Sequence, residues 1–432
     1  MLYLLLTTTL LMMSWNRYAG RIVFLSLSAY LVVLSNVWYH LSNAVVGELT
    51  STTLLFWQGL IRIDESILLS MMFLIFLGLI VMNRTTDLGW EFHLLLLGGL
   101  TGAIYMISAY DLLLMVVGFE FLNLSTYLIL SLYRGTETAT LKYLLSSAFY
   151  TTLLLLAVSF FYGMTGSTGY DALFLQMNYL DESSLLPQLL ILATLAFKLG
   201  LAPAHLWVPD VYDGLPMTLL SWMGTVPKAA ILLWLPTVYP LLSRLSPFLM
   251  VVAVSSFLIS AVMLGAQYKM KRFLAYSAIG HLGFIAAAFA IGDYHSYWYY
   301  VFIYLVTTLT QFVLLSELPR TELLKQTGAL GDHKALGIGF LVIVLTMASL
   351  PPFGGFYAKL LVMFGMLEVG YVVFAALLVL ASLRSAAYYL KWVQVSFFAE
   401  YNMASSPIVV QYPNLISFLI TLILPSTLLL LL

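Results

Sequence analysis

Four ionisable residues lie deep inside apolar stretches of this 432-residue chain: Glu120, Lys198, Lys228 and Lys359. On insertion scales, each charge at the centre of a membrane-spanning helix costs roughly 2.5–3.5 kcal/mol. Four of them would cost on the order of 10 kcal/mol, which is comparable to the whole stability of a folded protein. We therefore expect these side chains to face one another, water or a protein partner. Such a set is typical of an ion or proton path through a membrane.

Lys198 is the residue whose surroundings point most directly to proton exchange. It lies in LATLAFKLGLAPAHLWVPD, where Pro203 has no N–H to donate to the carbonyl of Leu199. Burial disfavours the charged form of an amine, which makes proton exchange feasible near neutral pH. Carbonyls freed by the break could hold water. The alternative is that this lysine extends to the membrane interface, but it lies too deep in its segment for that.

The other three charged residues each keep a structural alternative. Glu120, in MVVGFEFLNLSTYLIL, could load or release a proton as a nearby cation changes its charge, or it could be a neutral carboxyl that fixes helix packing. Lys228, in TVPKAAILLWL, would titrate together with Lys198 if the two lie close, or it could serve packing. Lys359 follows a helix break in LTMASLPPFGGFYAKLL and would end the path, or extend to the interface.

A histidine could connect the lysine sites. His281 lies in AYSAIGHLGF, and the unperturbed pKa of histidine is close to neutral pH. A lone histidine in a helix is more often a satisfied core residue. His205 shares the helix face of Lys198 only if the helix continues through the proline. The remaining polar candidates are more simply explained by capping, packing or contact with the membrane interface: Asp210, Asp213, Lys142, Arg384 and Lys391.

Composition indicates a membrane protein. The chain is 62% hydrophobic and 9% charged, whereas soluble domains carry about 25% charged residues. The net charge of −1 gives no basic surface for nucleic acid, and the absence of Cys excludes iron–sulfur ligation, thiolate metal sites and disulfides within the chain. We expect no cofactor in this chain; if it belongs to a redox enzyme, other subunits bind the flavin, iron–sulfur clusters and quinone. Its many Phe, Tyr and Trp residues are predicted to face lipid or to form interfacial belts.

Apolar runs recur along the whole chain and predict an all-α polytopic membrane protein of about 14 transmembrane helices. The first and third runs are short. The predicted segments are 2–13, 21–41, 67–82, 93–108, 110–131, 141–163, 187–206, 216–242, 247–266, 273–292, 296–316, 335–366, 370–396 and 414–432.

Charge asymmetry predicts the orientation. Loops after odd-numbered helices carry eleven Lys and Arg residues, and loops after even-numbered helices carry two, Arg62 and Arg244. The positive-inside rule then directs odd-numbered helices toward the cytoplasm or mitochondrial matrix and leaves both termini on the opposite side. The eleven are Arg17, Arg21, Arg84, Arg134, Lys142, Lys269, Lys271, Arg272, Arg320, Lys325 and Lys334.

The seventh and twelfth predicted helices are both interrupted, by Pro203 and by the pair Pro351 and Pro352. Each break lies near a buried lysine, and the two are five helices apart. This arrangement predicts two inverted five-helix repeats, helices 4–8 and 9–13, with an ion site at their interface. The predicted domains are therefore 1–92 for three N-terminal helices, 93–242 and 243–396 for the repeats, and 397–432 for the C-terminal helix.

Several of these stretches resemble a known family, the antiporter-like membrane subunits of respiratory complex I. The resemblance covers residues 110–366 and rests on FKLGLAPAHLWVPDVYDG with Lys228 after it, FEFLNLSTYLIL, LKYLLSSAFYTTLLLLAVSFFYGMTGST, KMKRFLAYSAIGHLGF and LPPFGGFYAKLLVM. The HLWVPDVY loop, with lysine at both 228 and 359, separates the chain from sister subunits, whose loop differs. The resemblance implies two inverted five-helix units with flanking helices.

The resemblance also implies a function and roles. The chain would be a non-redox, proton-translocating membrane subunit of NADH:quinone oxidoreductase. Its partners would be the other membrane-arm subunits, including the sister antiporter-like subunits, and the lipid bilayer. Glu120 and Lys198 would form a pair in the first half, Lys228 would connect the halves, His281 would lie on the central axis, and Lys359 would be the terminal lysine.

One position departs from the family. The family usually has a second proline where this chain has Thr218, in LPMT, which could alter the start of the eighth helix and the placement of Lys228. Two other functions stay open: a subunit of a multisubunit cation/proton antiporter, against which the HLWVPDVY loop argues, and a structural spacer with silent charges. The composition suits the mitochondrial inner membrane, with a bacterial plasma membrane as the alternative.

Overall fold

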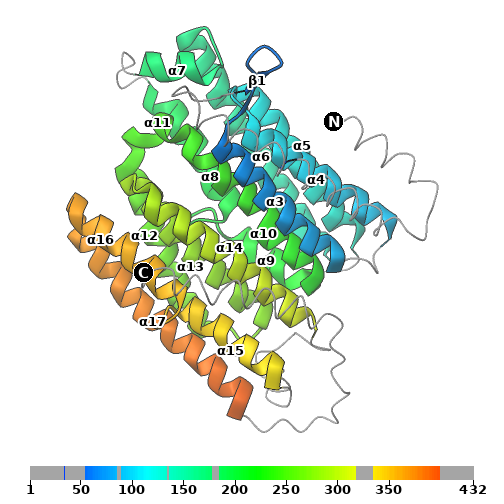
Figure 1. Ribbon diagram of the computed structural model, residues 1–432, viewed down its shortest axis with the longest axis vertical. Helices are drawn as coiled ribbons and strands as arrows, with labels where there is room; N and C mark the ends of the chain where they lie inside the picture. The colour runs from blue at the N-terminus through cyan, green and yellow to red at the C-terminus, as the bar shows by residue number, and fades with distance from the viewer. Residues whose placement is uncertain are drawn as a thin grey trace, which may run out of the picture. The chain divides into compact units, whose positions relative to one another are not determined.

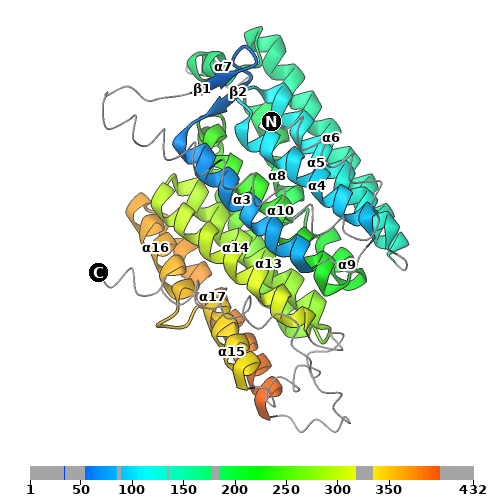
Figure 2. The same ribbon diagram turned by 45° about the vertical axis from the view of Figure 1, so that its right-hand side comes forward.

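The computed structural model describes Leu34 and residues 54–84, 89–133, 136–177, 184–317 and 334–398 (Figures 1 and 2). Within this part, eight helical runs are long and apolar enough to cross a membrane. The elements are β1 (Leu54–Phe56), β2 (Ile61–Ile63), α3 (Glu65–Arg84), α4 (Trp90–Ser108), α5 (Leu112–Leu132), α6 (Glu137–Thr165), α7 (Tyr170–Met177), α8 (Leu185–Leu199), α9 (Trp207–Gly214), α10 (Met217–Trp234), η2 (Leu235–Val238), α11 (Tyr239–Leu242), η3 (Ser243–Leu245), α12 (Ser246–Met263), η4 (Leu264–Ala266), α13 (Met270–Ile291), α14 (Tyr294–Ser316), α15 (Lys334–Ala348), α16 (Gly354–Val369) and α17 (Val372–Phe398).

The predicted segments from 67–82 to 370–396 correspond to these helices, with ends that differ by a few residues. Segment 335–366 divides into α15 and α16, as its prolines predicted, and segment 187–206 ends early, at Leu199. The first, second and last segments lie outside the described residues, except for Leu34, so the total of fourteen stays a prediction. Three elements were not predicted: the hairpin β1–β2 and the short helices α7 and α9.

The chain divides into two compact units. Unit 1 holds the described residues before Leu192 together with Thr225–Leu241, and unit 2 holds Leu192–Gly224 and the described residues from Leu242 onward. The division therefore falls within α8, within α10 and within α11. The two units are described separately below.

Unit 1 is organised around the crossing of α4 and α5. Gly102 and Gly118 lie at this crossing, where a Cβ on Gly102 would come within 2.7 Å of the Leu122 nitrogen and one on Gly118 within 2.7 Å of the Met106 nitrogen. Small residues of this kind let two membrane helices approach closely. Asp111 begins α5 by accepting a hydrogen bond from the Leu113 amide at 2.7 Å. The crossing thus fixes the helix that carries Glu120.

Unit 2 is built around α13 and α14, most of whose residues are buried. Helices α9, α12, α14 and α16 pack against α13, as Figures 1 and 2 show. A helix that is apolar on every side belongs in an interior. Gly283 lets α12 approach, because a Cβ there would lie 2.9 Å from the Ala253 carbonyl oxygen. Side chains on α13 are therefore enclosed by protein.

The helices that precede the two breaks, α8 and α15, end in the same type of C-terminal cap. At the end of α8, Leu201 donates to the Ala196 carbonyl at 2.7 Å and Gly200 to Phe197 at 3.0 Å, with Gly200 at a φ of +79°. These two bonds and the left-handed residue define a Schellman cap. Lys198 lies two residues before the left-handed position.

The cap that ends α15 repeats this pattern. Leu350 donates to Leu345 at 3.2 Å and Ser349 to Thr346 at 3.1 Å, with Ser349 at a φ of +57°. Here Met347 occupies the position that Lys198 has in α8. Both breaks predicted from proline are confirmed: α8 ends four residues before Pro203, and α15 ends three residues before Pro351.

We expect Gly200→Ala to destabilise the protein more than Gly370→Ala. Both glycines have positive φ, but a Cβ on Gly200 would meet Val208 at 2.5 Å, whereas nothing lies within 4 Å of one on Gly370. The left-handed backbone costs about 1–2 kcal/mol in either variant, and overpacking adds about 1–3 kcal/mol at Gly200. Thermal inactivation of the purified protein in detergent is the measurement. Equal midpoints for the two variants would contradict a tight α8–α9 junction.

Candidate functional site

Four of the five predicted site residues are buried: Lys198, Lys228, His281 and Lys359 have exposed fractions of 6%, 2%, 7% and 5%. Glu120 is partly exposed, beside a row of exposed apolar residues on α5. Glu120 and Lys228 belong to unit 1, and the other three to unit 2. The structure brings His281 and Lys359 together. The pairing of Glu120 with Lys198 and the connecting role of Lys228 stay predictions.

His281 is held in the interior of unit 2 by two tyrosines of α14. Its Nδ1 atom lies 3.1 Å from the hydroxyl oxygen of Tyr300, within hydrogen-bond distance. Its ring centre lies 6.1 Å from that of Tyr304, whose buried hydroxyl has no hydrogen-bond partner among the described residues. Tyr300 and Tyr304 are four residues apart and so lie on one face of α14. The histidine therefore has a polar partner that can exchange a proton with it.

Lys359 places its ammonium group against aromatic rings. The Nζ atom lies 5.1 Å from the ring centre of Phe284 and 5.9 Å from that of Phe257. An aromatic face attracts a cation through its quadrupole. The charge of Lys359 also acts electrostatically on His281. These aromatic residues are buried and do not face lipid, which corrects the prediction made for the aromatic residues as a class.

Lys198 occupies the last turn of α8, as the break predicted. The negative end of the helix dipole favours a cation there. Its Nζ atom lies 5.9 Å from the ring centre of Phe197, and the Phe197 carbonyl accepts a hydrogen bond from Trp207 Nε1 at 2.8 Å. The end of α8 is therefore tied to the start of α9.

Lys228 follows a proline inside α10. Pro227 has no N–H for the carbonyl of Met223, one turn earlier. Lys228 is among the largest fully buried side chains of the described residues. Thr218, the position that departs from the family, is the second residue of α10, and the helix begins directly after Pro216.

The weaker candidates lie elsewhere. Lys142, Arg384 and Lys391 are exposed, and His205 is buried in the turn between α8 and α9. Nothing in these positions links them to His281 or Lys359.

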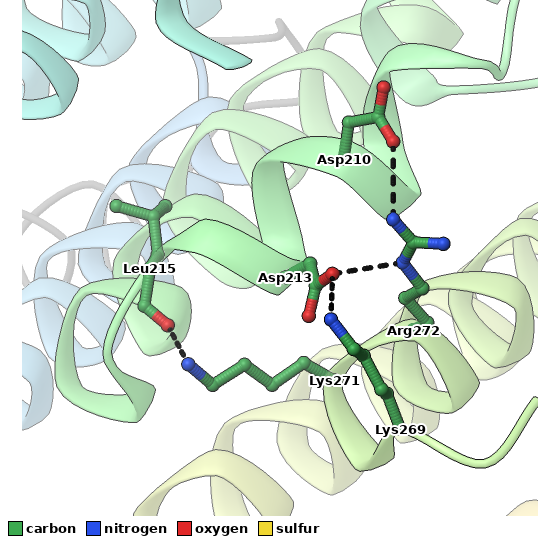
Figure 3. Close-up of polar contacts among 6 residues, drawn as sticks. All are labelled: Asp210, Asp213, Leu215, Lys269, Lys271 and Arg272. Atoms are coloured by element: carbon green, nitrogen blue, oxygen red, sulfur yellow. Dashed lines mark hydrogen bonds and ion pairs between the residues drawn. The ribbon is translucent and has the colours of Figure 1, made fainter. Parts of the chain in front are cut away.

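Asp213 ties α9 to α13 (Figure 3). Its Oδ2 atom lies 2.8 Å from Lys269 Nζ and 3.0 Å from Arg272 Nε. Asp210 lies 3.7 Å from Arg272 Nη2, and Lys271 donates to the Leu215 carbonyl at 2.5 Å. Basic residues at the start of α13 are unfavourable for its dipole, and Asp213 at the end of α9 is unfavourable for that of α9, so the ion pairs between them offset both effects.

Sequence reasoning treated these basic residues only as markers of orientation and assigned the two aspartates to capping or orientation. The structure gives the aspartates a definite partner, α13. The spacing of two acidic residues by three, with a basic run elsewhere, is too common a pattern to have predicted this contact.

The comparisons with known proteins establish the family of the chain. The family described as NADH:quinone oxidoreductase/Mrp antiporter, transmembrane region, matches residues 109–384. The chain belongs to this family. It is 77% identical, over the whole of both chains, to NADH-ubiquinone oxidoreductase chain 2 of Hyaloraphidium curvatum. It is 34% identical to NADH-quinone oxidoreductase subunit N of Hydrogenovibrio crunogenus, over 72% of this chain and 69% of that one.

A chain of respiratory complex I from Thermus thermophilus has the same fold. The TM-score is 0.85 and the sequence identity 28%, over 99% of this chain and 96% of that one. The predicted resemblance to the antiporter-like subunits of complex I is thereby confirmed. The matched region also contains all five predicted site residues, Glu120, Lys198, Lys228, His281 and Lys359.

We expect Asp213→Asn to loosen α9. The variant removes the charge that Lys269 and Arg272 share, and partly exposed pairs of this kind contribute up to about 1 kcal/mol each. Amide hydrogen exchange within Trp207–Gly214, measured by mass spectrometry, should therefore accelerate about fivefold. Asp210→Asn is the matched control, because Asp210 reaches Arg272 only at 3.7 Å. Equal exchange in both variants would contradict the dominant role given to Asp213.

Proposed function

We propose that this chain is a proton-translocating membrane subunit of an NADH:ubiquinone oxidoreductase. The observation that carries the proposal is a buried lysine and histidine, Lys359 and His281, joined through Phe284 and Tyr300 in the interior of a chain 77% identical to NADH-ubiquinone oxidoreductase chain 2. Intramembrane ionisable groups are costly and usually serve transport. The subunit itself carries out no redox chemistry; flavin, iron–sulfur clusters and quinone belong to partner subunits.

The proposed path has five members. A change of charge at one end alters the interaction between Glu120 and Lys198, which changes the proton affinity of the lysine. The proton then passes by way of Lys228 and His281 to Lys359. The contact of His281 with Tyr300 and the electrostatic contact with Lys359 support the last part of this order.

The proposed architecture is two inverted repeats, residues 93–242 and 243–396, within fourteen helices. The equal caps that end α8 and α15 support a repeat, because both helices stop in the same way before a proline. The proposed surroundings are the mitochondrial inner membrane, with both termini on the intermembrane-space side. The name of the eukaryotic relative supports this membrane. The proposed partners are the other membrane-arm subunits, including the sister antiporter-like subunits.

A multisubunit cation/proton antiporter is the second candidate. The family description includes the Mrp antiporters, and the buried lysines would suit an antiporter equally well. Copurification of the chain with flavin and iron–sulfur proteins would favour the oxidoreductase. Isolation in a complex that lacks both would favour the antiporter.

Lys198→Met should abolish most proton translocation coupled to NADH oxidation. The variant keeps the length and apolar packing of the side chain but cannot bind a proton. Proton uptake and NADH oxidation are measured together in sealed membrane vesicles, after the amount of assembled complex has been matched. Lys142→Met is the control, because Lys142 is an exposed lysine of α6. An unchanged ratio of protons to NADH in Lys198→Met would contradict the proposed path and indicate that its buried ionisable residues have a structural role only.

A further inference from the structure

One aromatic side chain contacts both Lys359 and the tyrosine that lies within hydrogen-bond distance of His281. The ring of Phe284 stacks on that of Tyr300, with 5.8 Å between ring centres and 16° between planes. The ammonium group of Lys359 lies over the same Phe284 ring at 5.1 Å. Tyr300 in turn lies 3.1 Å from His281. Phe284 is therefore the side chain that Tyr300 and Lys359 share.

The position of Phe284 is fixed by close helix packing. Phe257 meets the Phe284 ring edge to face, with 4.3 Å between ring centres, and also lies 5.9 Å from Lys359 Nζ. Helix α12, which carries Phe257, approaches α13 at Gly280 and Gly283, where an added Cβ would collide with Ser260 and Ala253. The two glycines thus allow the close approach of α12 and α13 that brings Phe257 into contact with Phe284.

A ring in this position has two consequences for a proton. The aromatic face stabilises the ammonium form of Lys359 but gives no comparable stabilisation to the neutral amine. The ring is also apolar and offers no hydrogen-bonding group, so it cannot itself carry a proton between Tyr300 and Lys359, both of which it contacts. Proton transfer between side chains requires hydrogen-bond distance or a bridging water.

We propose that Phe284 is a gating residue for proton transfer between His281 and Lys359, with Tyr300 as the intermediate carrier. With the ring in place, Lys359 keeps its proton and the path is closed. When the ring rotates away, a hydrogen-bonded path opens. Protonated His281 then gives its Nδ1 proton to the Tyr300 hydroxyl oxygen, while Tyr300 passes its own hydroxyl proton, directly or through one water, to the neutral Lys359 Nζ. The return of the ring stabilises the new ammonium group and closes the path behind it.

This inference rests on the proposed function, and its test separates the two. Passive decay of an imposed pH gradient is measured in sealed vesicles that contain the assembled complex, without NADH. The ratio of protons translocated to NADH oxidised is then measured in the same vesicles. A purely structural role of Phe284 would alter assembly or turnover but would not create a proton leak.

Phe284→Ala should let the gradient decay several-fold faster and lower the proton-to-NADH ratio, because the gap admits water. Phe284→Leu should stay close to wild type in leak, since it retains an apolar plug. Phe273→Ala is the matched control: Phe273 is a buried phenylalanine of α13 that packs on Tyr389 and Trp392, away from Lys359. The inference is overturned if Phe284→Ala leaks no faster than Phe273→Ala and keeps the wild-type ratio.

A further variant covers failure of Phe284→Ala to assemble. Phe284→Tyr keeps the ring and adds a hydroxyl group that can join the hydrogen-bonded chain. We expect a leak above wild type, and a wild-type leak with an unchanged ratio would overturn the gate. If Lys198→Met abolishes translocation while every Phe284 variant behaves as wild type, the proposed function stands and the gate falls. If Lys198→Met changes nothing, the proposed function itself fails.

Discussion

The cost of holding an amine in an apolar interior governs the architecture of unit 2. A buried ammonium group needs stabilisation, but a fixed carboxylate beside it would hold its proton too firmly for exchange. Lys359 lies against the faces of two phenylalanines, and an aromatic face stabilises a cation only modestly. Lys198 lies at the end of a helix, where the dipole contributes a similarly moderate amount. Moderate stabilisation suits a group that must both bind and release a proton.

Helix breaks supply this environment. An intact helix uses its carbonyls internally, whereas a helix that ends inside the membrane needs a cap or another partner for its last ones. The cap of α8 needs a left-handed residue and has glycine, while the cap of α15 places Ser349 in the same conformation. Helix α16 can begin against α15 only because Gly355 has no side chain; a Cβ there would lie 1.9 Å from the Thr346 carbonyl oxygen. Lys198 thus precedes the break at the end of α8, whereas Lys359 follows the break between α15 and α16.

Apolar length and proline position predicted most of the fold, because both act over a single segment. The helices from α3 to α17 and both breaks follow from such local patterns. The hairpin did not, since its turn places Trp57 and Gln58 at positive φ, where neither residue is favoured. The aromatic surroundings of Lys359 were also missed: Phe257 and Phe284 lie on different helices, and a phenylalanine that faces lipid has the same sequence environment as one that faces a lysine. The ionisable residues were found because burial of charge is unusual wherever it occurs.

Helix α13 connects the end of α8 and helix α9 to the aromatic residues around Lys359. Its first turn is bound to α9 through Asp213, and α9 in turn holds the end of α8 through the Trp207–Phe197 hydrogen bond. Phe284 lies twelve residues beyond Arg272 on the same helix, which places it about 18 Å farther along the axis. A helix enclosed on all sides cannot bend freely, because a close-packed interior transmits displacement instead of absorbing it. A shift of α9 that kept its ion pairs would therefore displace Phe284, and with it the environment of Lys359. Lys198 at the end of α8 and Lys359 could influence each other in this way without direct contact.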